Sequence, residues 1–304
     1  MNYLIGVDVG GTKIDCIIAD AEGNILSEVT TVGGNPLVIG IDKAAENIWS
    51  SIKECNRETQ ISFSDVNLAL IGSTGTGRKE DSDNLLNELK RISDFKNIKV
   101  TTDAHIALEG AFPNQPGCIL IAGTGSIIYG KDEEGIIHRA GGFGSLIGDQ
   151  GGGYSIGRKG LAAVSKEFDG RGKKTLITEL LADKFNIRNS GELITNVYNK
   201  KLFIPDVTPL IIEASEKDDD VAINILNTES GELIKHIVAI KKKLKLENFK
   251  LSFSGSLIKN KNYYSDLLRN KIEKELPFVA VTESESTPAK GAILLAKKHL
   301  AENK

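Results

Sequence analysis

The chain has 304 residues, of which 40% are hydrophobic and 26% charged, so it can bury a sizeable core and is more typical of two domains than of one. A formal net charge of −3 excludes an electrostatic preference for nucleic acid or for an anionic membrane. No apolar run approaches the roughly 20 residues of a membrane helix, and the N-terminal stretch MNYLIGVDVGG has no basic leader region. We therefore expect a cytoplasmic protein with neither nucleic acid nor membrane among its partners.

Cysteine and histidine usage predicts neither disulfides nor zinc. The three cysteines, Cys16, Cys55 and Cys118, are scattered and odd in number, which suits a reducing compartment. The four histidines show no ligand spacing with cysteine.

The first elements surround a glycine-rich turn, in the stretch IGVDVGGTKIDCII. A Walker phosphate loop needs lysine directly after the glycine, whereas the order here is Gly11-Thr12-Lys13, so that motif is excluded. The run after Lys13 is apolar and β-branched, and ADAEGNIL follows it. The pattern predicts a strand, a turn and a second strand, with a third strand to follow.

Strands and helices then alternate. The sequence predicts helices at residues 40–60, 79–93 and 104–111, and strands at 66–71 and 98–102. This order is typical of a mixed sheet flanked by helices.

The second half of the chain starts with a pattern that repeats the start of the first half. The stretch CILIAGTGSIIYGKDEEGIIH repeats the plan of apolar strand, Gly/Thr turn, apolar strand and acidic turn about 115 residues after the first copy. Two copies indicate two related domains, each with a hairpin turn whose backbone N–H groups are free to approach an anion. The chain is then largely helical from 152 to 246, returns to strands in FKLSFSG and VAVT, and closes with a helix that starts at Thr287-Pro288.

Glycine is concentrated between residues 141 and 160, where nine of twenty residues are glycine. Such a stretch lets the backbone approach a ligand closely, and Asp149 within it offers a carboxylate that accepts hydrogen bonds. The alternative is that Asp149 caps the next helix.

Two further aspartates stand at the ends of predicted apolar strands. Asp8 ends an apolar strand beside the Gly10-Gly11-Thr12 turn, a place suited to Mg²⁺, although an acidic turn residue is commonly structural. Asp103 follows the strand IKVTT and is our candidate for the base that accepts the proton of an attacking hydroxyl group. Its alternative role is a helix N-cap, and the two roles are compatible.

These segments, together with GNPLVIGIDK, FSGSLIKN and TPAKGAILLA, resemble the BadF/BadG/BcrA-type ATPases, and within them the N-acetylglucosamine kinases. The resemblance covers nearly the whole chain in the right order. It implies an α/β fold of two actin-like (ribonuclease H-like) domains with mixed sheets flanked by helices and an ATP cleft between them. The domains would comprise residues 1–112 plus 288–304, and 113–287 with a helical insertion.

The resemblance also implies ATP and Mg²⁺ as cofactors and a small amino sugar as substrate, with a homodimer as the assembly. The implied activity is transfer of the γ-phosphoryl group to the 6-hydroxyl group of N-acetylglucosamine, and also of N-acetylmuramic acid in cell-wall sugar recycling. Asp8 would hold the metal and Asp103 would be the base. Residues implied for ATP are Gly10, Gly11, Thr12, Lys13, Gly123, Thr124, Gly125, Gly255 and Ser256. Residues implied for the sugar are Asn35, Asp103, Ser126, Gly142, Phe143 and Asp149.

Some positions depart from the family pattern. Ser126-Ile127 stands where the animal kinases have Ser-Asn, and Phe143 stands where they have tryptophan. Arg78, in STGTGR, either meets an acidic sugar or is a solvated surface residue.

Three other activities of this fold stay open. One is a glucosamine or other hexose kinase. The second is an ATP-driven activator of a dehydratase, which would need cluster cysteines, and no second cysteine stands near Cys118. The third is an actin-like filament or chaperone ATPase, which would use ATP without a sugar.

Overall fold

The structure, a computed structural model, describes residues 2–93, 95–199 and 201–302. The chain divides into two compact units. Unit 1 comprises Met1–Gly117 and Glu283–Lys304, and unit 2 comprises Cys118–Thr282. Each is considered by itself below.

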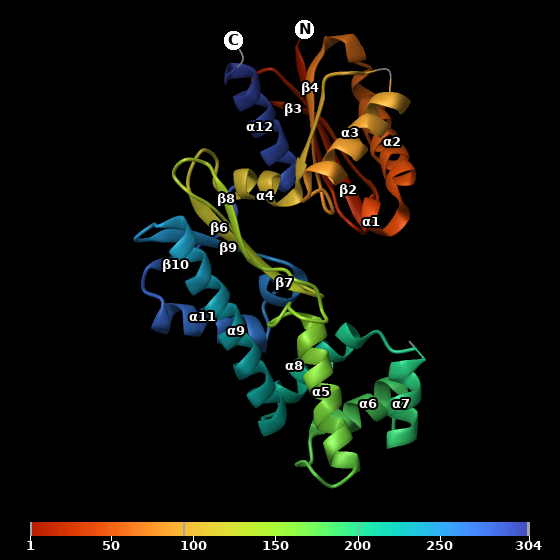
Figure 1. The fold of residues 1–304 in the computed structure, drawn as a ribbon, viewed down its shortest axis with the longest axis vertical. Coiled ribbons are helices and arrows are strands. Elements are labelled where there is room, and N and C mark those ends of the chain that lie inside the picture. Colours follow the sequence, from red (N-terminus) through yellow and green to blue (C-terminus); the bar gives the residue numbers. More distant parts are fainter. Residues whose placement is uncertain (1, 94, 200, 303–304) are drawn as a thin grey trace. The chain divides into compact units, whose positions relative to one another are not determined.

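Unit 1 is a five-stranded sheet with helices on both faces (Figure 1). Its strands are β1 (Tyr3–Val9), β2 (Lys13–Asp20), β3 (Ile25–Val32), β4 (Val66–Ser73) and β5 (Ile98–Thr102). Its helices are α1 (Pro36–Ile39), α2 (Ile41–Thr59), η1 (Phe63–Asp65), α3 (Lys79–Ile92), α4 (Asp103–Ala111) and α12 (Pro288–Glu302). The strand order is β3-β2-β1-β4-β5, with β1, β4 and β5 parallel and the first three strands antiparallel.

Both faces of the central strands are buried. On one face Ile5 and Val7 of β1 join a core that contains Ile48 of α2. On the other face Leu4 joins a core that contains Ile293 of α12. Because helices cover both faces of the sheet, the residues of β1 and β4 are almost all apolar and do not alternate between apolar and polar.

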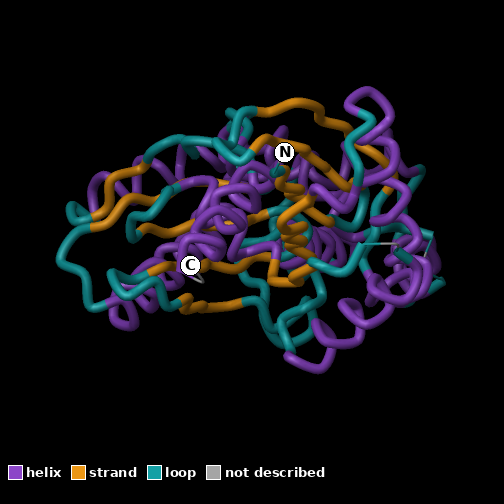
Figure 2. The backbone as a smooth tube through the Cα atoms, turned by 90° about the horizontal axis from the view of Figure 1, so that it is seen from above, coloured by secondary structure: helices purple, strands orange, loops and turns teal. Residues whose placement is uncertain are grey.

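Unit 2 repeats the sheet and adds helices. Its strands are β6 (Gly117–Ala122), β7 (Ser126–Lys131), β8 (Ile137–Gly141), β9 (Phe249–Ser254) and β10 (Val279–Val281). Its helices are α5 (Gly153–Phe168), α6 (Leu176–Phe185), α7 (Ser190–Tyr198), η2 (Ile204–Val207), α8 (Thr208–Glu216), α9 (Asp220–Leu244), α10 (Ser256–Lys259) and α11 (Tyr263–Glu275). Figure 2 shows the same backbone with strands in orange and helices in purple.

The strand order of unit 2, β10-β9-β6-β7-β8, is that of unit 1 read from the other edge. In both sheets the first strand lies in the middle, between the second and the fourth. The expected fold class, two mixed sheets flanked by helices in the actin-like arrangement, is therefore confirmed. The helical insertion lies between β8 and β9, and its apolar residues share one core with β6, β7 and β9.

Most predicted elements of unit 1 agree with the structure to within two residues. The predicted helix 40–60 is α2, for which Gly40 is the N-cap and Gln60 the C-cap in the left-handed conformation. In unit 2 the helices α10 and α11 were not predicted. The predicted helix after Thr287-Pro288 is α12.

The unit boundaries fall at Gly117 and Glu283, whereas the sequence suggested 112 and 288. The segment before α12 is attached to the end of α4. The Ser286 N–H donates to the Gly110 carbonyl at 2.8 Å, and the Glu285 N–H to the Ala111 carbonyl at 3.3 Å. These bonds explain why residues 283–287 group with unit 1.

Among the helices that the structure describes, none combines the length and the apolar character needed to cross a membrane.

Candidate active site

Unit 1 brings two carboxyl groups to one edge of its sheet. Asp8 is the last residue but one of β1, and it pairs with Gly72 of the parallel strand β4. Gly72 pairs in turn with Thr101 of β5, and Asp103 follows β5 directly. Because the carboxyl ends of parallel strands lie at the same edge, Asp8 and Asp103 both lie at the edge where open α/β sheets bind ligands.

Asp103 is held in place by local hydrogen bonds. Its Oδ1 accepts from the Ala104 N–H at 2.8 Å, and the Thr74 side chain donates a hydrogen bond to the carboxylate. The expectation that Asp103 caps α4 is wrong. Thr102 is the N-cap, since its Oγ1 accepts from the His105 N–H at 3.2 Å. Asp103 is therefore the first residue of α4 and not its cap.

The electrostatics of this edge disfavour charge on both aspartates. Burial, the Asp103 charge and the Asp15 charge raise the pKa of Asp8 to about 7, and Lys13 opposes them. Burial also raises the pKa of Asp103. A bound cation would relieve this accumulation of carboxylates.

The Gly10-Gly11-Thr12 turn is exposed and tightly tied. The Gly10 N–H donates to the Lys13 carbonyl at 2.9 Å, and the Gly10 carbonyl accepts from the Gly34 N–H at 3.0 Å. Gly11 and Thr12 face solvent. Lys13 forms an ion pair with Asp15 at 2.6 Å, so its ammonium group already has a partner.

Asn35 lies in a neighbouring loop of unit 1. Its Oδ1 caps α1 by accepting from the Leu37 N–H at 3.0 Å, and a Cβ on Gly75 would lie 3.2 Å from the same oxygen. In the described part of the chain its amide nitrogen has no hydrogen-bond partner. Asn35 therefore combines a capping oxygen with an amide donor that is free for a ligand. Arg78 is exposed and begins α3 as its N-cap residue.

Unit 2 places the second hairpin turn at the carboxyl end of β6. The Gly123 N–H donates to the Gly125 carbonyl at 3.0 Å, and the Gly123 and Thr124 carbonyls accept from the first residues of α5, Gly153 and Tyr154, at 2.7 and 2.9 Å. Gly255 follows the adjacent parallel strand β9 with φ +86°. The two predicted ATP segments of unit 2 therefore lie beside one another.

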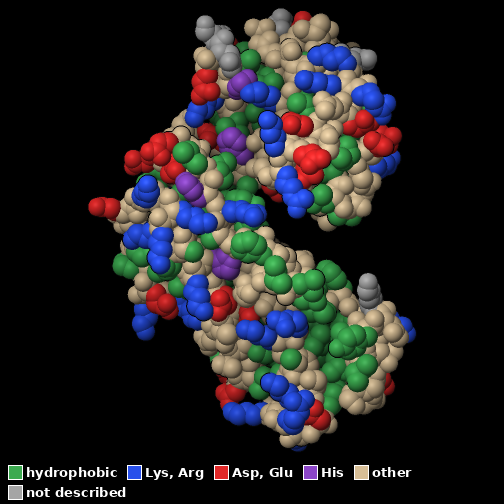
Figure 3. Space-filling model, in the orientation of Figure 1, with side chains coloured by type: hydrophobic (Ala, Val, Ile, Leu, Met, Phe, Trp, Pro, Cys, Tyr) green, Lys and Arg blue, Asp and Glu red, His purple; other side chains and the backbone are tan. Residues whose placement is uncertain are grey.

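A cavity of about 670 Å³ in unit 2 opens at these turns. Gly123, Thr124 and Ser256 line one part of it. The rest, which sequence reasoning missed, is formed by Gly153, Phe203, Pro205, Asp206, Thr208, Pro209, Ile212, Glu213, Glu216, Leu257 and Asn262. Apart from Leu257 of α10, its apolar members come from the helical insertion, and they carry no motif by which the sequence could have revealed them. Apolar side chains are also exposed over this face of unit 2 (Figure 3).

A second hollow of about 280 Å³ adjoins the glycine-rich loop. Asp149, Gly125, Ser126 and Gly142 line it. Asp149 has φ +58°, and its Oδ1 accepts from the Gly144 N–H at 3.1 Å. The expectation that Asp149 caps α5 is wrong, because Gly152 is the N-cap.

Ser126 and Phe143, both predicted to contact the sugar, differ in exposure: Ser126 is buried and Phe143 is exposed. Ser126 is buried, and its Oγ donates to the Gln150 carbonyl at 2.6 Å, so it supports the loop. Phe143 is 64% exposed, with the Arg139 guanidinium 5.7 Å from its ring centroid. Phe143 is therefore largely open to solvent, with Arg139 near its ring.

The predicted site residues thus fall into two groups. Unit 1 brings together Asp8, the Gly10–Thr12 turn and Asp103, with Asn35 in a loop of the same unit. Unit 2 brings together the Gly123–Gly125 turn, Gly255, Gly142 and Asp149. Sequence reasoning missed Thr74, although it lies in the STGTGR loop that drew attention for Arg78 alone.

The cysteines do not form a cluster that is open to solvent. Cys16, Cys55 and Cys118 are all free and buried, and burial raises the pKa of Cys118. In the described ranges no group of three or more His, Cys, Asp or Glu side chains could hold a metal ion by protein ligands alone. A metal at Asp8 would accordingly take most of its ligands from water and substrate, as Mg²⁺ does.

The model of the BadF/BadG/BcrA/BcrD ATPase family matches residues 5–296. The chain belongs to this family. Among curated members, it is 32% identical over 302 residues to an N-acetylmuramic acid/N-acetylglucosamine kinase of Clostridium acetobutylicum, a match that covers 98% of this chain and 99% of that protein. It is also 32% identical to an N-acetyl-D-glucosamine kinase of Dictyostelium discoideum, with 96% and 97% covered.

Solved structures agree on the fold of this family member. One from Chromobacterium violaceum, named as an N-acetylglucosamine kinase, has a TM-score of 0.75 at 21% identity and covers 97% of this chain and 98% of that chain. A ROK family glucokinase from Streptomyces griseus has a TM-score of 0.56 at 16% identity, with 99% and 100% covered. At these identities the likeness establishes the actin-like sugar-kinase fold alone.

Proposed function

We propose that the protein is an ATP-dependent amino-sugar kinase that transfers the γ-phosphoryl group to the 6-hydroxyl group of N-acetylglucosamine. The observation that carries the proposal is the placement of Asp103. Its carboxylate is oriented by Ala104 and Thr74 at the ligand-binding edge of the sheet, while Thr102 does the capping. The names of the full-length relatives indicate which hydroxyl compound such a base would serve.

Unit 2 supplies the ATP site in this proposal. The apolar part of the 670 Å³ cavity, with Phe203 and Ile212, suits an adenine ring. The Gly123–Gly125 turn and Gly255 suit the phosphates, because backbone N–H groups without a Cβ in the way approach anions closely.

Asp8 fits a magnesium ion. It is a half-buried carboxylate beside an exposed glycine turn, and burial together with Asp103 and Asp15 disfavours its charge in the absence of a cation. When bound with ATP, Mg²⁺ supplies neutralisation of the triphosphate charge. Asp8 would hold the hydrated ion, and the Gly10–Thr12 turn would add backbone donors next to the phosphates.

Asp103 accepts the proton of the attacking hydroxyl group. Burial raises its pKa, which brings the carboxylate closer to the basicity needed for a proton acceptor near neutral pH. The hydrogen bonds from Ala104 and Thr74 keep the carboxylate from rotating away, so that orientation is set before the sugar binds.

The residues that we assign to the sugar are Asn35 in unit 1 and, in unit 2, Gly142, Phe143 and Asp149. The Asn35 amide and the Asp149 carboxylate offer hydrogen bonds, and the exposed Phe143 ring offers an apolar surface. A site built to bond an acetamido group rejects glucose, since its polar groups would be left unpaired. N-acetylmuramic acid is the second substrate we propose, which would link the enzyme to recycling of cell-wall sugars.

The test is a panel of sugars assayed for ADP release, with the phosphorylated carbon located by NMR. We expect N-acetylglucosamine to react at the 6-hydroxyl group, N-acetylmuramic acid to follow, and glucose to have a far lower kcat/KM. Equal kcat/KM for glucose and N-acetylglucosamine would refute amino-sugar selectivity. Light scattering and cell fractionation test the homodimer and the cytoplasmic location that belong to the same proposal.

A further inference from the structure

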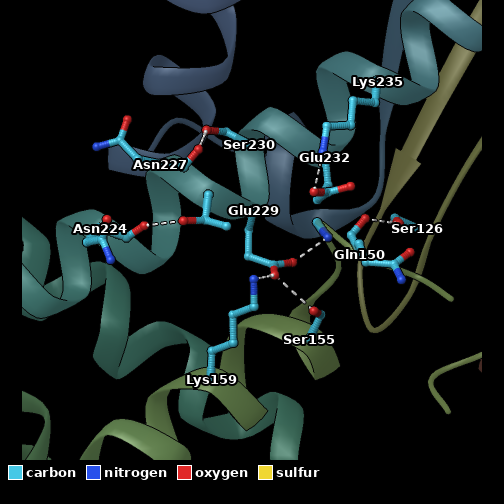
Figure 4. Close-up of polar contacts among 12 residues, drawn as sticks. Ser126, Gln150, Ser155, Lys159, Asn224, Asn227, Glu229, Ser230, Glu232 and Lys235 are labelled. Carbon is cyan, nitrogen blue, oxygen red and sulfur yellow. Dashed lines mark hydrogen bonds and ion pairs between the residues drawn. The ribbon is translucent and has the colours of Figure 1, made fainter. Parts of the chain in front are cut away.

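The Gln150–Gly151 segment of the glycine-rich loop is held by side chains from three other elements of unit 2. Figure 4 shows two of these side chains, Ser126 and Glu229. Ser126 Oγ of β7 donates to the Gln150 carbonyl at 2.6 Å. The Gly151 N–H donates to Glu229 Oε2 of α9 at 2.5 Å. The hydroxyl group of Tyr264, from α11, donates to the Gly151 carbonyl at 3.0 Å. One glycine thus has both of its backbone polar groups bonded by buried side chains far away in the sequence.

Glu229 is the unusual member of this set. Its side chain is fully buried, and its second oxygen, Oε1, accepts from Ser155 Oγ at 3.0 Å and from Lys159 Nζ at 2.6 Å. A buried carboxylate is costly unless it is paired and hydrogen-bonded, and a neutral acceptor would satisfy one N–H equally well. Three donors from two segments converge on this one carboxylate, which indicates a role in orientation.

Gly151 itself is shaped for this contact. Its φ is +88°, and a Cβ at this position would collide with the Leu233 side chain. Tyr264 is fully buried, and burial followed by the Glu229 charge raises its pKa, so that its hydroxyl group stays protonated as a donor. The loop therefore packs closely against α9 at Gly151 and is hydrogen-bonded to α11 through Tyr264.

We call the contacts of Glu229 and Tyr264 with Gly151 the clamp. Gly151 lies between Asp149, which is predicted to contact the sugar, and the residues bonded to the Gly123 turn, which is predicted to contact ATP. On one side the Gly152 N–H donates to the Asp149 carbonyl at 3.1 Å. On the other side the Gly153 N–H donates to the Gly123 carbonyl of the hairpin turn at 2.7 Å. By contrast Leu146, in the middle of the loop, is 92% exposed. Asp149 is thus placed relative to Gly123 through the clamp.

We infer that Glu229 is a positioning residue that, with Lys159 and Tyr264, fixes the Asp149 end of the glycine-rich loop for sugar binding. Only the expected effect on KM for the sugar rests on the proposed amino-sugar kinase function. The clamp as a structural device stands on the contacts above.

The first test is Glu229→Gln. An amide has one acceptor oxygen where the carboxylate has two, so at least one of the three donors then faces an NH₂ group. We expect KM for N-acetylglucosamine to rise about tenfold or more, since small misplacements of positioning groups have large kinetic effects. KM for ATP should change less than twofold.

The matched control is Glu232→Gln, the same change one helical turn further along α9. Glu232 is 30% exposed and forms an ion pair with Lys235 at 2.7 Å, so both KM values should stay as in the wild type. A second control, Ile240→Val, loosens the core under α9 without touching the loop. It should lower the melting temperature and leave KM for the sugar unchanged.

A neutral double variant provides a rescue. In Glu229→Gln combined with Lys159→Met, the amide oxygen can accept from Gly151 while its NH₂ group donates to Ser155. We expect KM for the sugar to return at least halfway, on a logarithmic scale, towards the wild-type value. If Glu229→Gln lowered the melting temperature as Ile240→Val does but left KM for the sugar unchanged, the positioning role would be wrong.

Amide hydrogen exchange separates failure of this inference from failure of the proposed function. In Glu229→Gln and in Tyr264→Phe, peptides covering residues 141–153 should exchange faster than in the wild type, and peptides covering β1 and α4 should not change. This measurement needs no sugar, so it holds even if no amino sugar is phosphorylated. Unchanged exchange in 141–153 would overturn the clamp.

Discussion

The charge of Asp103, which follows β5, acts on Asp8 near the end of β1. Burial first, and the Asp103 charge second, raise the pKa of Asp8 to about 7 from its ordinary value of 3.8. The two residues are 95 positions apart in the sequence, and the parallel pairing of β1, β4 and β5 brings them together. Because this repulsion disfavours a charged Asp8, we expect removal of that charge to raise the free energy of unfolding.

Asp8→Asn should stabilise the metal-free protein while impairing catalysis. The native pKa of Asp8 exceeds its unfolded value, so native stability is greatest below about pH 4 for this group and declines as the pH rises towards and through 7. At pH 8 the variant should unfold with a free energy about 1–4 kcal/mol higher than the wild type. Denaturant unfolding at pH 5 and pH 8 measures the difference, which should be larger at pH 8.

The catalytic half of this prediction uses the same variant with Mg-ATP. The loss of one charged group that orients the metal should lower kcat by about 10²–10³-fold. Wild-type turnover at matched metal concentration would rule out Asp8 as the metal residue. A variant less stable than the wild type at pH 8 would contradict the electrostatics.

Asp103→Asn and Thr102→Ala should separate catalysis from helix capping. Asp103→Asn leaves the Thr102 cap intact, so stability should change little, while the loss of a general base should lower kcat by about 10²–10⁴-fold. Thr102→Ala removes the cap and should cost about 1 kcal/mol of stability with most activity per folded molecule retained. Thermal unfolding and initial rates of the two variants decide, and the reverse pattern would make Asp103 a structural residue.

Gly123→Ala should weaken ATP binding without harming the fold. A Cβ on Gly123 meets no described atom within 4 Å, so it would project into the space that we assign to phosphate. Gly231→Ala, within α9, likewise meets no described atom within 4 Å and is the control, expected to be neutral or to stabilise by up to about 1 kcal/mol. Calorimetric titration with ATP should show weaker binding for Gly123→Ala alone. Equal affinity for ATP in the two variants would contradict the assignment of the phosphates to this turn.

Asn35→Asp should impair sugar binding selectively. Aspartate keeps an oxygen for the Leu37 N–H, so α1 remains capped, but it lacks the amide donor. We expect KM for N-acetylglucosamine to rise by about 10-fold, the effect of about one lost hydrogen bond, with KM for ATP unchanged. An unchanged sugar KM would assign Asn35 to the turn alone.

Local patterns were sufficient for much of the fold. The alternation of apolar strands and amphipathic helices located β4, β5, α2 and α3 to within two residues, because these elements bury a continuous face that the sequence must encode. The repeated hairpin plan also predicted two related domains, and the structure shows that their two sheets have the same strand order. The helix α11 was missed because its apolar residues are less clearly gathered on one face than those of α3, although both helices are polar on average.

The sequence by itself determined that Asp8 and Asp103 end apolar strands and that glycine turns accompany them, because strand ends and turns are written in neighbouring residues. Tertiary structure alone decided which side chain caps α4, since Thr102 and Asp103 are both good caps and the geometry at the end of β5 selects one. It also decided the clamp, in which Glu229 meets Gly151 across 78 positions. A buried glutamate in a 25-residue helix carries no local signal, because its partners are defined only when the chain has folded around them.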